Sequence, residues 1–389
     1  SISAAPISGT TDLLAAAAAG FLEGALSQTR IWQYHYNTLA KTWSPTKTFA
    51  EFVDANEEYM DKKIATADPS DEFWHNVALI RAQLRGIHLG YSSVAPSQQA
   101  LTYRQLLHIN LEGDMENIPT QPGKPSSSPG RRGHCSSLVK LLPDNSDLYV
   151  SQVTWSTLNS MLRVYKRYNF AFKRSAAPDA KTYAEDVTFS SYPASLASMD
   201  DFYLTSQHLA IQETTFGVYS NISDKIKPQC VFEYARNIVA NRLARTGGEW
   251  AYVFGLENSG TYNNQFQVID YKRFTPGENL QEGVFHLIEQ IPTMVVSTDM
   301  SDYLQREMYF GSYNLAYFPD VIKLSGQADQ ERKYGSWFNW NDTARAKIFR
   351  RDHVKVTDMQ SMQRLMRYND YKHDPLSRCD CTPPYTTEN

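Results

Sequence analysis

The first third of the chain carries apolar side chains at the three- and four-residue steps of a helix. One series follows Asp12 and consists of Leu14, Ala18, Phe21, Ala25, Trp32, Tyr36 and Leu39. A second consists of Phe49, Phe52, Val53, Tyr59 and Met60, and a third, N-capped by Ser70, of Phe73, Val77, Ile80, Leu84 and Ile87. A shorter helix is expected over 101–108. Each series predicts one helix face that is buried against the rest of the protein.

The pattern changes after a long segment that has no periodicity. Residues 121–134 read QPGKPSSSPGRRGH, and such a run of proline, glycine, serine and arginine is typical of an exposed loop that proteases can reach. Beyond it, 136–142 and 148–153 are short apolar-rich runs joined by Pro143-Asp-Asn-Ser-Asp147, which predicts a β-hairpin. The break therefore separates a helical part from a part that begins with strands.

The remaining pattern predicts a mixed fold. A helix is expected over 155–168, with further helices near 230–244 and 359–368. Strands are expected at 187–191, 202–205, 210–218, 266–270, 284–290 and 294–297. Because hairpins are followed by helices without a regular βαβ alternation, we predict an α+β architecture with mainly antiparallel sheets.

Composition excludes several classes of protein. The 389 residues are 42% hydrophobic and 21% charged, which is too apolar for wholesale disorder. The 38 basic and 42 acidic side chains give a net charge of −4, so no overall field attracts nucleic acid or an anionic membrane. No uncharged run reaches the roughly 18 residues of a membrane span. The chain begins Ser-Ile-Ser, so we expect any targeting segment to be missing from it.

Cysteine, histidine and asparagine patterns narrow the chemistry. Four cysteines are too few for a disulfide framework, and within Cys379-Asp380-Cys381 a local surface disulfide is favoured over a weak metal pair. The nine histidines lack metal-ligand spacing, so no metal is expected. Metalloprotease, serine-esterase and dinucleotide-binding motifs are absent from the sequence. Sequons at Asn221 and Asn341 favour a secretory or lysosomal route.

Cys135 occupies a chemically distinctive position. It lies between the cleavable loop and the first strand of the hairpin, so a cut before it would make it an N-terminal residue. An N-terminal cysteine combines a nucleophilic thiol with an α-amine of pKa about 7.7–8.0, which can act as its base. The same thiol can attack the carbonyl of His134 and make the cut through a thioester. The alternative is a buried, inert cysteine.

Several motifs resemble those of the phospholipase B-like family, also called lamina ancestor proteins. They are Gly133-His-Cys135-Ser-Ser-Leu-Val-Lys-Leu-Leu-Pro143, Thr154-Trp155, Phe189-Ser-Ser-Tyr-Pro193, Asp200-Asp-Phe-Tyr203, Asn237-Ile-Val-Ala-Asn-Arg-Leu-Ala244, Asn258-Ser-Gly-Thr-Tyr-Asn-Asn-Gln265, Glu289-Gln-Ile-Pro292 and Arg345-Ala-Lys-Ile-Phe-Arg-Arg-Asp352. The resemblance runs along nearly the whole chain. The segments 365–370 and 373–377 are more similar to the second, lysosomal branch of the family, phospholipase B-like 2, than to the first.

The resemblance implies a fold and a maturation step. The fold is that of the N-terminal nucleophile (Ntn) hydrolases, a four-layer αββα sandwich with antiparallel sheets. The precursor would be cut between His134 and Cys135, leaving a helical fragment 1–134 and a nucleophile-bearing fragment 135–389 that pack as one globular unit. Relatives extend beyond both ends of this chain, and missing strands would leave sheet edges unpaired, which a homo-oligomer would cover.

The resemblance also implies an activity and a location. It implies a hydrolase that cleaves acyl ester or amide bonds through a thioester on Cys135, in the lysosome lumen or secreted. The substrate would be a phospholipid or an N-acyl small molecule, with no metal or organic cofactor and no nucleic-acid partner. The alternative is a lysosomal lipid- or ligand-binding protein of the same fold with little or no catalysis. A carbohydrate-stacking role for the abundant aromatic side chains is a third interpretation.

The family site implies roles for individual residues. Cys135 matches the nucleophile, Trp155 a pocket wall, Thr215 a hydrogen-bond donor and Asn314 an oxyanion-hole residue. Arg345 matches a site arginine that would bind a carboxylate or phosphate, or orient Asn314. Taken singly, these four partners have structural interpretations as a core aromatic, a strand residue, a turn former and an ion pair.

One position departs from the family pattern. Gln152 lies on the second hairpin strand, where mammalian relatives carry a histidine. Glutamine can position a substrate by hydrogen bonds, but it cannot accept a proton. An essential histidine at this position would leave the chain impaired, whereas an α-amine base would not. Gln152 therefore favours the binding-protein alternative without affecting the predicted fold.

Overall fold

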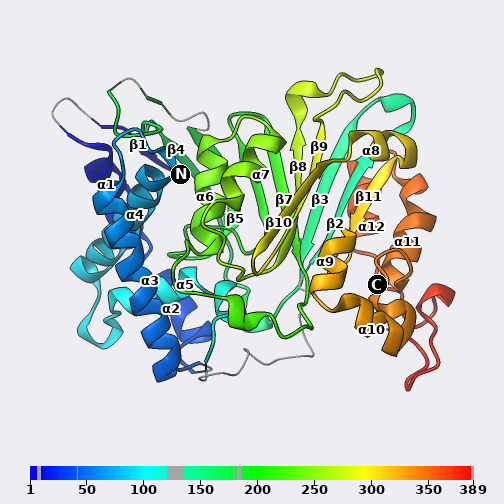
Figure 1. The fold of residues 1–389 in the computed structure, drawn as a ribbon, viewed down its shortest axis with the longest axis horizontal. Coiled ribbons are helices and arrows are strands. Elements are labelled where there is room, and N and C mark those ends of the chain that lie inside the picture. Colours follow the sequence, from blue (N-terminus) through cyan, green and yellow to red (C-terminus); the bar gives the residue numbers. More distant parts are fainter. Residues whose placement is uncertain (7–9, 42, 121–134, 179, 182–184, 387–389) are drawn as a thin grey trace. The chain divides into compact units, whose positions relative to one another are not determined.

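The computed structural model describes residues 1–6, 10–41, 43–120, 135–178, 180–181 and 185–386. These residues contain twelve α-helices and eleven β-strands, and the strands pair mainly antiparallel (Figure 1). They divide into two compact units. Unit 1 comprises Ser1–Ser127, Ser156–Leu209 and Ile222–Tyr262, and unit 2 comprises Ser128–Trp155, Ala210–Asn221 and Asn263–Asn389. The predicted α+β class is confirmed.

Unit 1 contains seven α-helices among its described residues. They are α1 (Asp12–Leu26), α2 (Gln28–Thr38), α3 (Lys47–Thr66), α4 (Glu72–Val94), α5 (Tyr103–Asn110), α6 (Glu233–Leu243) and α7 (Gly247–Gly255). Its strands, in the order in which they neighbour one another, are β1 (Ile2–Ala4), β4 (Val164–Phe170), β5 (Asp186–Ser191) and β6 (Phe202–Thr205). β1 runs parallel to β4, and the other neighbouring strands are antiparallel.

Unit 2 contains two sheets and five α-helices among its described residues. One set of strands has the order β7 (Leu209–Thr215), β8 (Asn264–Asp270), β9 (Phe285–Ile291) and β10 (Met294–Asp299), and the other has the order β11 (Tyr309–Ser312), β2 (Cys135–Leu141) and β3 (Leu148–Thr154). The helices are α8 (Ser301–Glu307), α9 (Pro319–Leu324), α10 (Gln327–Tyr334), α11 (Ala344–Asp352) and α12 (Met359–Met366).

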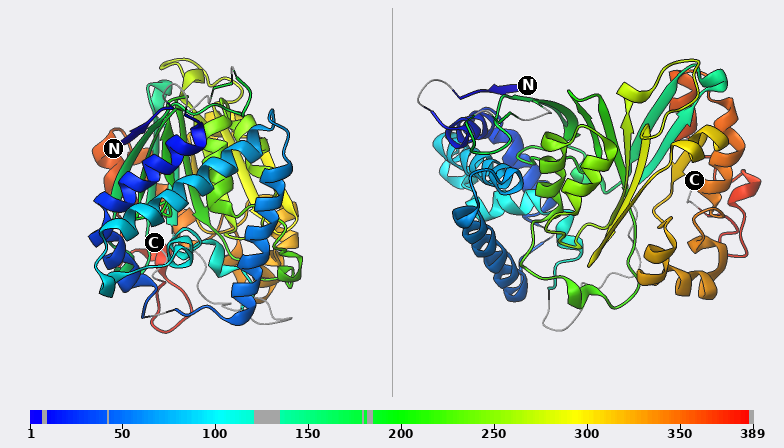
Figure 2. Two further views of the ribbon diagram at one scale, coloured as in Figure 1. Left: turned by 90° about the vertical axis from the view of Figure 1, so that its left-hand side faces the viewer. Right: turned by 45° about the horizontal axis from the view of Figure 1, so that its top comes forward.

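The small sheet of unit 2 has helices on one face and strands on the other. Its helix side forms a buried apolar cluster that includes Leu138, Tyr313, Phe349 and Met362, so α11 and α12 cover it. On the other side, Ser137 accepts a hydrogen bond from Gln267 of β8 at 2.6 Å. The small sheet of unit 2 therefore has α11 and α12 against one face and β8 against the other, and the ribbon can be followed in Figure 2.

Three predictions about individual elements were wrong. The predicted helix over 155–168 is instead a short 3-10 turn (Leu158–Ser160) and the strand β4. Along β4 the buried positions are 166, 168 and 170, with exposed residues between them, so the true period is two. The N-cap of α4 is Asp71, whose side chain accepts from Trp74 N at 3.0 Å, and not Ser70.

The third error concerns the face on which α1 packs. Leu14, Ala18 and Phe21 are exposed, whereas the small residues Ala15, Ala16, Ala19, Gly20 and Gly24 are buried. α1 packs against α4 with the two backbones in close approach: a Cβ on Gly20 would lie 1.9 Å from Gln83 O, and one on Gly86 of α4 would lie 2.1 Å from Ala17 O. Backbone contact thus replaces the expected packing of large side chains.

We expect Gly20→Ala to destabilise unit 1 by about 3 kcal/mol. Overpacking a core typically costs roughly 1–3 kcal/mol, and here the obstruction is the carbonyl of Gln83, which cannot turn aside like a side chain. Urea unfolding measures the loss. Ala18→Leu adds more volume on the exposed side of the same helix and should change the unfolding free energy by no more than about 0.5 kcal/mol. Equal effects of the two variants would contradict the packing described.

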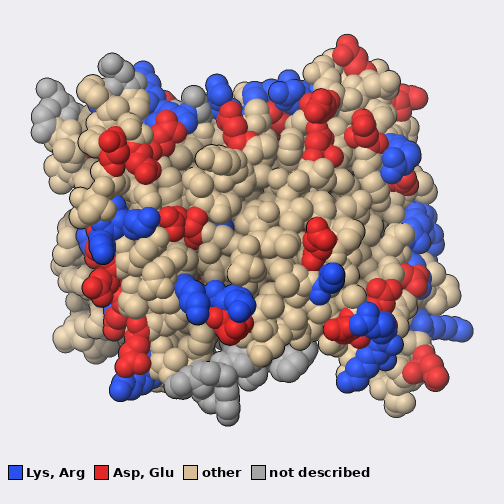
Figure 3. Space-filling view, viewed as in Figure 1, with Lys and Arg blue, Asp and Glu red and all other residues tan. Residues whose placement is uncertain are grey.

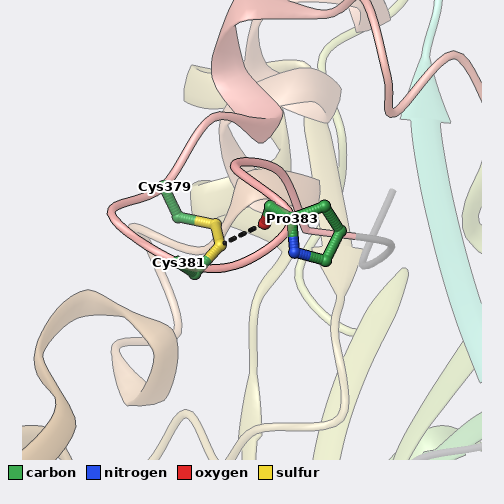
Figure 4. The surroundings of a disulfide bond; sticks show 3 residues. All are labelled: Cys379, Cys381 and Pro383. Atoms are coloured by element: carbon green, nitrogen blue, oxygen red, sulfur yellow. Dashed lines mark hydrogen bonds between the residues drawn. A yellow bond between two sulfur atoms is a disulfide. The ribbon is translucent and has the colours of Figure 1, made fainter.

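The C-terminal cysteines form the expected surface disulfide. Cys379 and Cys381 are joined, with their Cα atoms 5.3 Å apart (Figure 4). Cys381 Sγ also lies 3.0 Å from the carbonyl oxygen of Pro383. The thiols of Cys135 and Cys230 take no part in a disulfide, and both residues are buried. The sulfur of Cys135 is therefore not consumed by a bridge.

The surface agrees with the near balance of charges. Lys and Arg side chains are interspersed with Asp and Glu side chains on the face shown in Figure 3. Among the described residues, no helix combines the length and apolar character needed to cross a bilayer.

Candidate functional site

Cys135 is the first residue of β2 and is fully buried. β2 is the central strand of its sheet, with Cys135 opposite Thr154 of β3 and Ser137 opposite Ser312 of β11. At Cys135 the strand pairs with β3, and from Ser137 onward pairing on both sides holds its backbone in place. The residue that the sequence singled out therefore stands at a rigid position, directly after the segment 121–134.

Arg345 connects the start of β2 with the end of β11. It lies in the first turn of α11, whose N-cap Thr343 accepts from Ala346 N at 3.1 Å, and it is only 4% exposed. Its Nη1 donates to the carbonyl oxygen of Cys135 at 2.9 Å and to Oδ1 of Asn314 at 2.8 Å. Nη1 also lies 2.9 Å from Ser136 Oγ, and Nη2 donates to the carbonyl oxygen of Tyr313 at 3.0 Å. These contacts favour the orienting role over the binding of an external anion.

Asn314 is fixed in both backbone and side chain. Its φ of 65° lies in the left-handed region, which asparagine tolerates better than most residues. Because its Oδ1 accepts from Arg345, its amide nitrogen points the other way, and Nδ2 donates to the carbonyl oxygen of Thr215 at 2.7 Å. A side-chain amide has two N–H donors, so one remains for a second acceptor. An oriented amide with a spare donor is the property required of an oxyanion-hole residue.

Thr215 and Trp155 complete the set that the structure brings together. Thr215 ends β7 and is buried, and its hydroxyl has no hydrogen-bond partner in the part of the chain that the structure describes. A buried hydroxyl without a partner is costly, which suggests a role toward a bound molecule. The ring of Trp155 lies 5.6 Å from Cζ of Arg345, and the residue is 44% exposed, so it borders this cluster on the solvent side.

Gln152 is a neighbour of the cluster. It lies on β3 opposite Ser137, and its Oε1 accepts from Thr154 Oγ1 at 3.1 Å. Its Nε2 is buried without a hydrogen-bond partner among the described residues. Gln152 thus has a spare donor near the start of β2, but its side chain has no proton to exchange at neutral pH.

Sequence analysis missed Glu213 and Ser136. A carboxylate oxygen of Glu213 lies within 4.8 Å of Cys135 Sγ, and both residues are buried. Glu213 precedes Thr215 by two positions on β7, so the alternation of a strand places both on one face, and this signal was present in the sequence. A thiol and a carboxylate are both metal ligands, but these two groups alone do not make a metal site.

Buried polar side chains fill the space between the two sheets of unit 2. Ser312 Oγ donates to Gln265 Oε1 at 2.5 Å and lies 2.5 Å from Thr214 Oγ1. Gln265 Nε2 in turn donates to Glu289 at 2.5 Å, and the backbone N–H of Tyr317 donates to the same carboxylate oxygen at 2.6 Å. Burial is the main cause that raises the pKa of Glu289 to about 7. Packing alone would not require buried hydrogen-bonded side chains, so this network indicates that polar groups have a role in unit 2 beyond packing.

We expect the stability of the protein relative to a Glu289→Gln variant to fall as the pH rises from 4.5 to 7. The folded state raises the pKa of this carboxyl from 4.5 to about 7, so folding favours the protonated form. That contribution is complete below pH 4.5 and is lost as the pH approaches 7, by up to about 3 kcal/mol in the difference between the two proteins. Urea unfolding at several pH values measures it.

The exposed carboxylate of Glu278 is the matched control for this titration. A Glu278→Gln variant, which loses an exposed carboxylate, should change the unfolding free energy by no more than about 0.5 kcal/mol. A difference between the parent and Glu289→Gln that does not change with pH would show that folding does not raise the pKa of Glu289.

The remaining predicted positions are not brought into the cluster. His134 and the peptide bond that precedes Cys135 lie outside the described residues. Both sequon asparagines of unit 2, Asn221 and Asn341, are exposed, and Arg350 donates to the side chain of Asn341. Their exposure is compatible with glycosylation, which stays a prediction.

Comparison with known proteins identifies the family. The profile described as Phospholipase B matches residues 2–387. A phospholipase B-like 1 protein of Caenorhabditis elegans is 41% identical over 388 residues, which cover 96% of this chain and 66% of that protein. Phospholipase B-like 2 proteins of Bos taurus and Homo sapiens are each 40% identical over 394 residues, covering 97% of this chain and 67% of theirs. The chain spans about two thirds of the length of the curated relatives it matches.

This α+β chain has a buried cysteine in a polar cluster, and it is similar to proteins that are named for a lipid hydrolase. It therefore falls in the class of hydrolase-related proteins. The match over residues 2–387 and identities near 40% show more than the class. The chain belongs to the phospholipase B family, which confirms the resemblance drawn from its motifs.

Proposed function

We propose that this protein is a hydrolase of the N-terminal nucleophile type that cleaves acyl ester or amide bonds through a thioester on Cys135. The observation that carries the proposal is the hydrogen-bonded chain from the Cys135 carbonyl through Arg345 to Asn314 and on to Thr215. It joins the start of a central strand to an amide with a spare donor. A purely structural cysteine would need no such arrangement.

The proposed reaction needs an α-amine at Cys135. The amine accepts the thiol proton, and the thiolate attacks the acyl carbonyl to form a C–S bond. Asn314 donates to the resulting oxyanion, and the α-ammonium returns the proton to the departing alcohol or amine as the C–O or C–N bond breaks. Water, deprotonated by the amine, then attacks the thioester carbonyl, the C–S bond breaks to release the carboxylic acid, and the α-ammonium returns the proton to the departing thiolate. Metal ions and organic cofactors have no step in this scheme.

The amine would arise by cleavage between His134 and Cys135. The thiol of Cys135 attacks the carbonyl of His134, the peptide nitrogen leaves as the new α-amine, and water hydrolyses the thioester. Fragments 1–134 and 135–389 would then remain associated as one folded protein. The loop-like composition of 121–134 supports an accessible cleavage site.

The αββα sandwich belongs to the same proposal. Unit 2 supports it with a helical layer on one face of the small sheet and a second sheet on the other. The reacting bond is proposed to lie in a lipid or N-acyl small molecule, because the relatives are named for phospholipase B. The two exposed sequon asparagines support a secreted or lysosomal protein, and a homo-oligomer remains part of this proposal.

A binding protein with little catalysis is the second candidate. Gln152, which cannot exchange a proton at neutral pH, favours it. Its spare Nε2 donor could hold a ligand without transforming it.

Mass spectrometry under denaturing, reducing conditions tests the proposal. We expect two polypeptides that meet at Cys135, and after treatment with a thiol-directed acyl analogue the added mass should map to Cys135 alone. Cys230 is the internal control, because burial raises the pKa of its thiol to about 12 and keeps it unreactive. A cleaved but unlabelled protein would favour the binding candidate. A single uncut polypeptide in mature material would overturn the proposal.

A further inference from the structure

Unit 1 contains a pocket that is separate from the cluster around Cys135. It lies among α4, α6 and the strands β4, β5 and β6, and five of its twelve lining residues are aromatic, Phe170, Phe172 and Phe189 among them. The pocket has about 460 Å³ of empty space, which is partly open to solvent. Its inner cavity, counted as the space open to the centres of water-sized groups, is about 20 Å³. An inner cavity of this size holds one or two water-sized groups. A mainly apolar wall with few polar groups is typical of a site for a small organic molecule.

Arg242 brings an uncompensated positive charge to this pocket. It lies on α6 and is 5% exposed, and its Nη1 has no hydrogen-bond partner among the described residues. Among the described residues, the guanidinium makes one hydrogen bond, from Nη2 to Oε1 of Gln83, at a long 3.4 Å. Cζ also lies 5.6 Å from the ring of Phe170 and 5.5 Å from that of Phe172. Burial lowers the pKa of Arg242 to about 10.

Other buried cations of unit 1 are compensated, which makes Arg242 distinctive. Lys166 is paired with Glu23 at 2.7 Å. Arg236 donates to the carbonyl oxygens of Val231 and Phe254 and to Ser259. Arg242 has no ion pair with any carboxylate of the described chain, and leaving a buried charge unpaired is strongly destabilising. Such a charge indicates a counter-ion that comes from outside the protein.

Gln83 points to the same ligand. Its Oε1 accepts from Arg242, while its Nε2 is buried and has no partner in the described part of the chain. Gln83 is 1% exposed, so solvent does not satisfy this donor. Two neighbouring side chains on the pocket wall therefore offer unused N–H donors. The one carboxylate on the wall, Glu185, is exposed and therefore lies toward the solvent end.

We propose that this pocket binds a monocarboxylic acid with an apolar chain, its carboxylate held by Arg242 and Gln83 and its chain lying against the phenyl rings. The guanidinium and the amide supply donors for the two carboxylate oxygens, and a carboxylate matches the small enclosed volume. The aromatic wall accepts the chain and gains from its burial. This site neither contains nor requires Cys135, so it stands apart from the proposed hydrolysis.

Calorimetric titration of the full chain with octanoate tests the site. We expect saturable 1:1 binding that tightens about fourfold for each methylene added from butanoate to octanoate, in line with about 0.8 kcal/mol per buried CH₂. Octanol, which lacks the charge, and chloride, which lacks the chain, should each bind at least tenfold more weakly than octanoate. Absence of saturable octanoate binding, or chloride binding as tight as octanoate, would overturn the proposal.

Variants assign the binding to the two donors. Arg242→Met keeps the apolar part of the side chain and should weaken octanoate binding about 10- to 100-fold. Gln83→Leu should weaken octanoate binding several-fold, and it tests the pocket even if Arg242→Met fails to fold. Arg245→Met is the matched control, because Arg245 is exposed and pairs with Glu249 on the surface. It should bind octanoate like the parent. Unchanged affinity in both the Arg242 and Gln83 variants would refute the assignment.

Discussion

Alanine in place of Cys135 is expected to yield a folded chain that stays uncut before residue 135 and releases no fatty acid. The substitution removes the only group that forms the thioester in the proposed scheme, so both self-cleavage and turnover should be lost together. The Arg345 contacts with the backbone carbonyl of residue 135 and with Asn314 do not involve the sulfur and should survive. Release of acid from phosphatidylcholine vesicles and from an N-acyl amide measures the activity.

Cys230→Ala is the control for this experiment. Cys230 is also buried, and its sulfur lies 3.6 Å from Asn56 Nδ2 in unit 1, so its loss should affect stability without affecting cleavage or turnover. Circular dichroism establishes that both variants are folded. Turnover that persists in Cys135→Ala would place the chemistry at another residue.

Asn314→Ala should lower kcat by about 10²–10³ with a much smaller change in KM. Removing one oxyanion-hole donor typically costs about 2.7–4 kcal/mol of transition-state stabilisation, and this donor acts on charge that develops only in the transition state. The structure gives the amide a defined direction through Arg345 and Thr215, so water entering the vacated space would be a poor substitute. Steady-state kinetics with the better of the two substrates measures the change.

Asn145→Ala is the matched control for Asn314→Ala. Asn145 also has a left-handed backbone, with φ of 52°, is buried, and accepts a hydrogen bond from Gln305, but it lies in the hairpin turn at the other end of β2. Its replacement should reduce stability and leave kcat unchanged. A similar fall in kcat for both variants would mean that Asn314 acts through folding alone.

The positions of helices and strands were predicted best where the sequence shows a single clear pattern of apolar residues. The hairpin of β2 and β3 and the strands β5, β6, β8, β9 and β10 were predicted within a few residues, because short runs rich in apolar residues, bounded by turn residues, define them. α1 was located correctly, but its buried face was not. Its alanines and glycines allow a backbone approach to α4 that no count of large apolar residues reveals.

The site was only partly predictable for a different reason. Cys135 could be chosen from its place after the loop, but Arg345 is 210 positions away from it, and no spacing rule joins residues so far apart. Only the resemblance to a family suggested Asn314 and Arg345. Glu213 was missed although it stands two residues before Thr215, a spacing that places both residues on one face of a strand.

The Arg345 contacts hold Cys135 from one side only. The guanidinium binds the carbonyl oxygen of Cys135 and the side chain of Ser136, which both lie downstream of the proposed scission. When the bond before Cys135 breaks, these two hydrogen bonds would keep the new N-terminus in place. Neither of them involves a residue before Cys135. The amine released by the cut would therefore remain beside the thiol for which it is the proposed base.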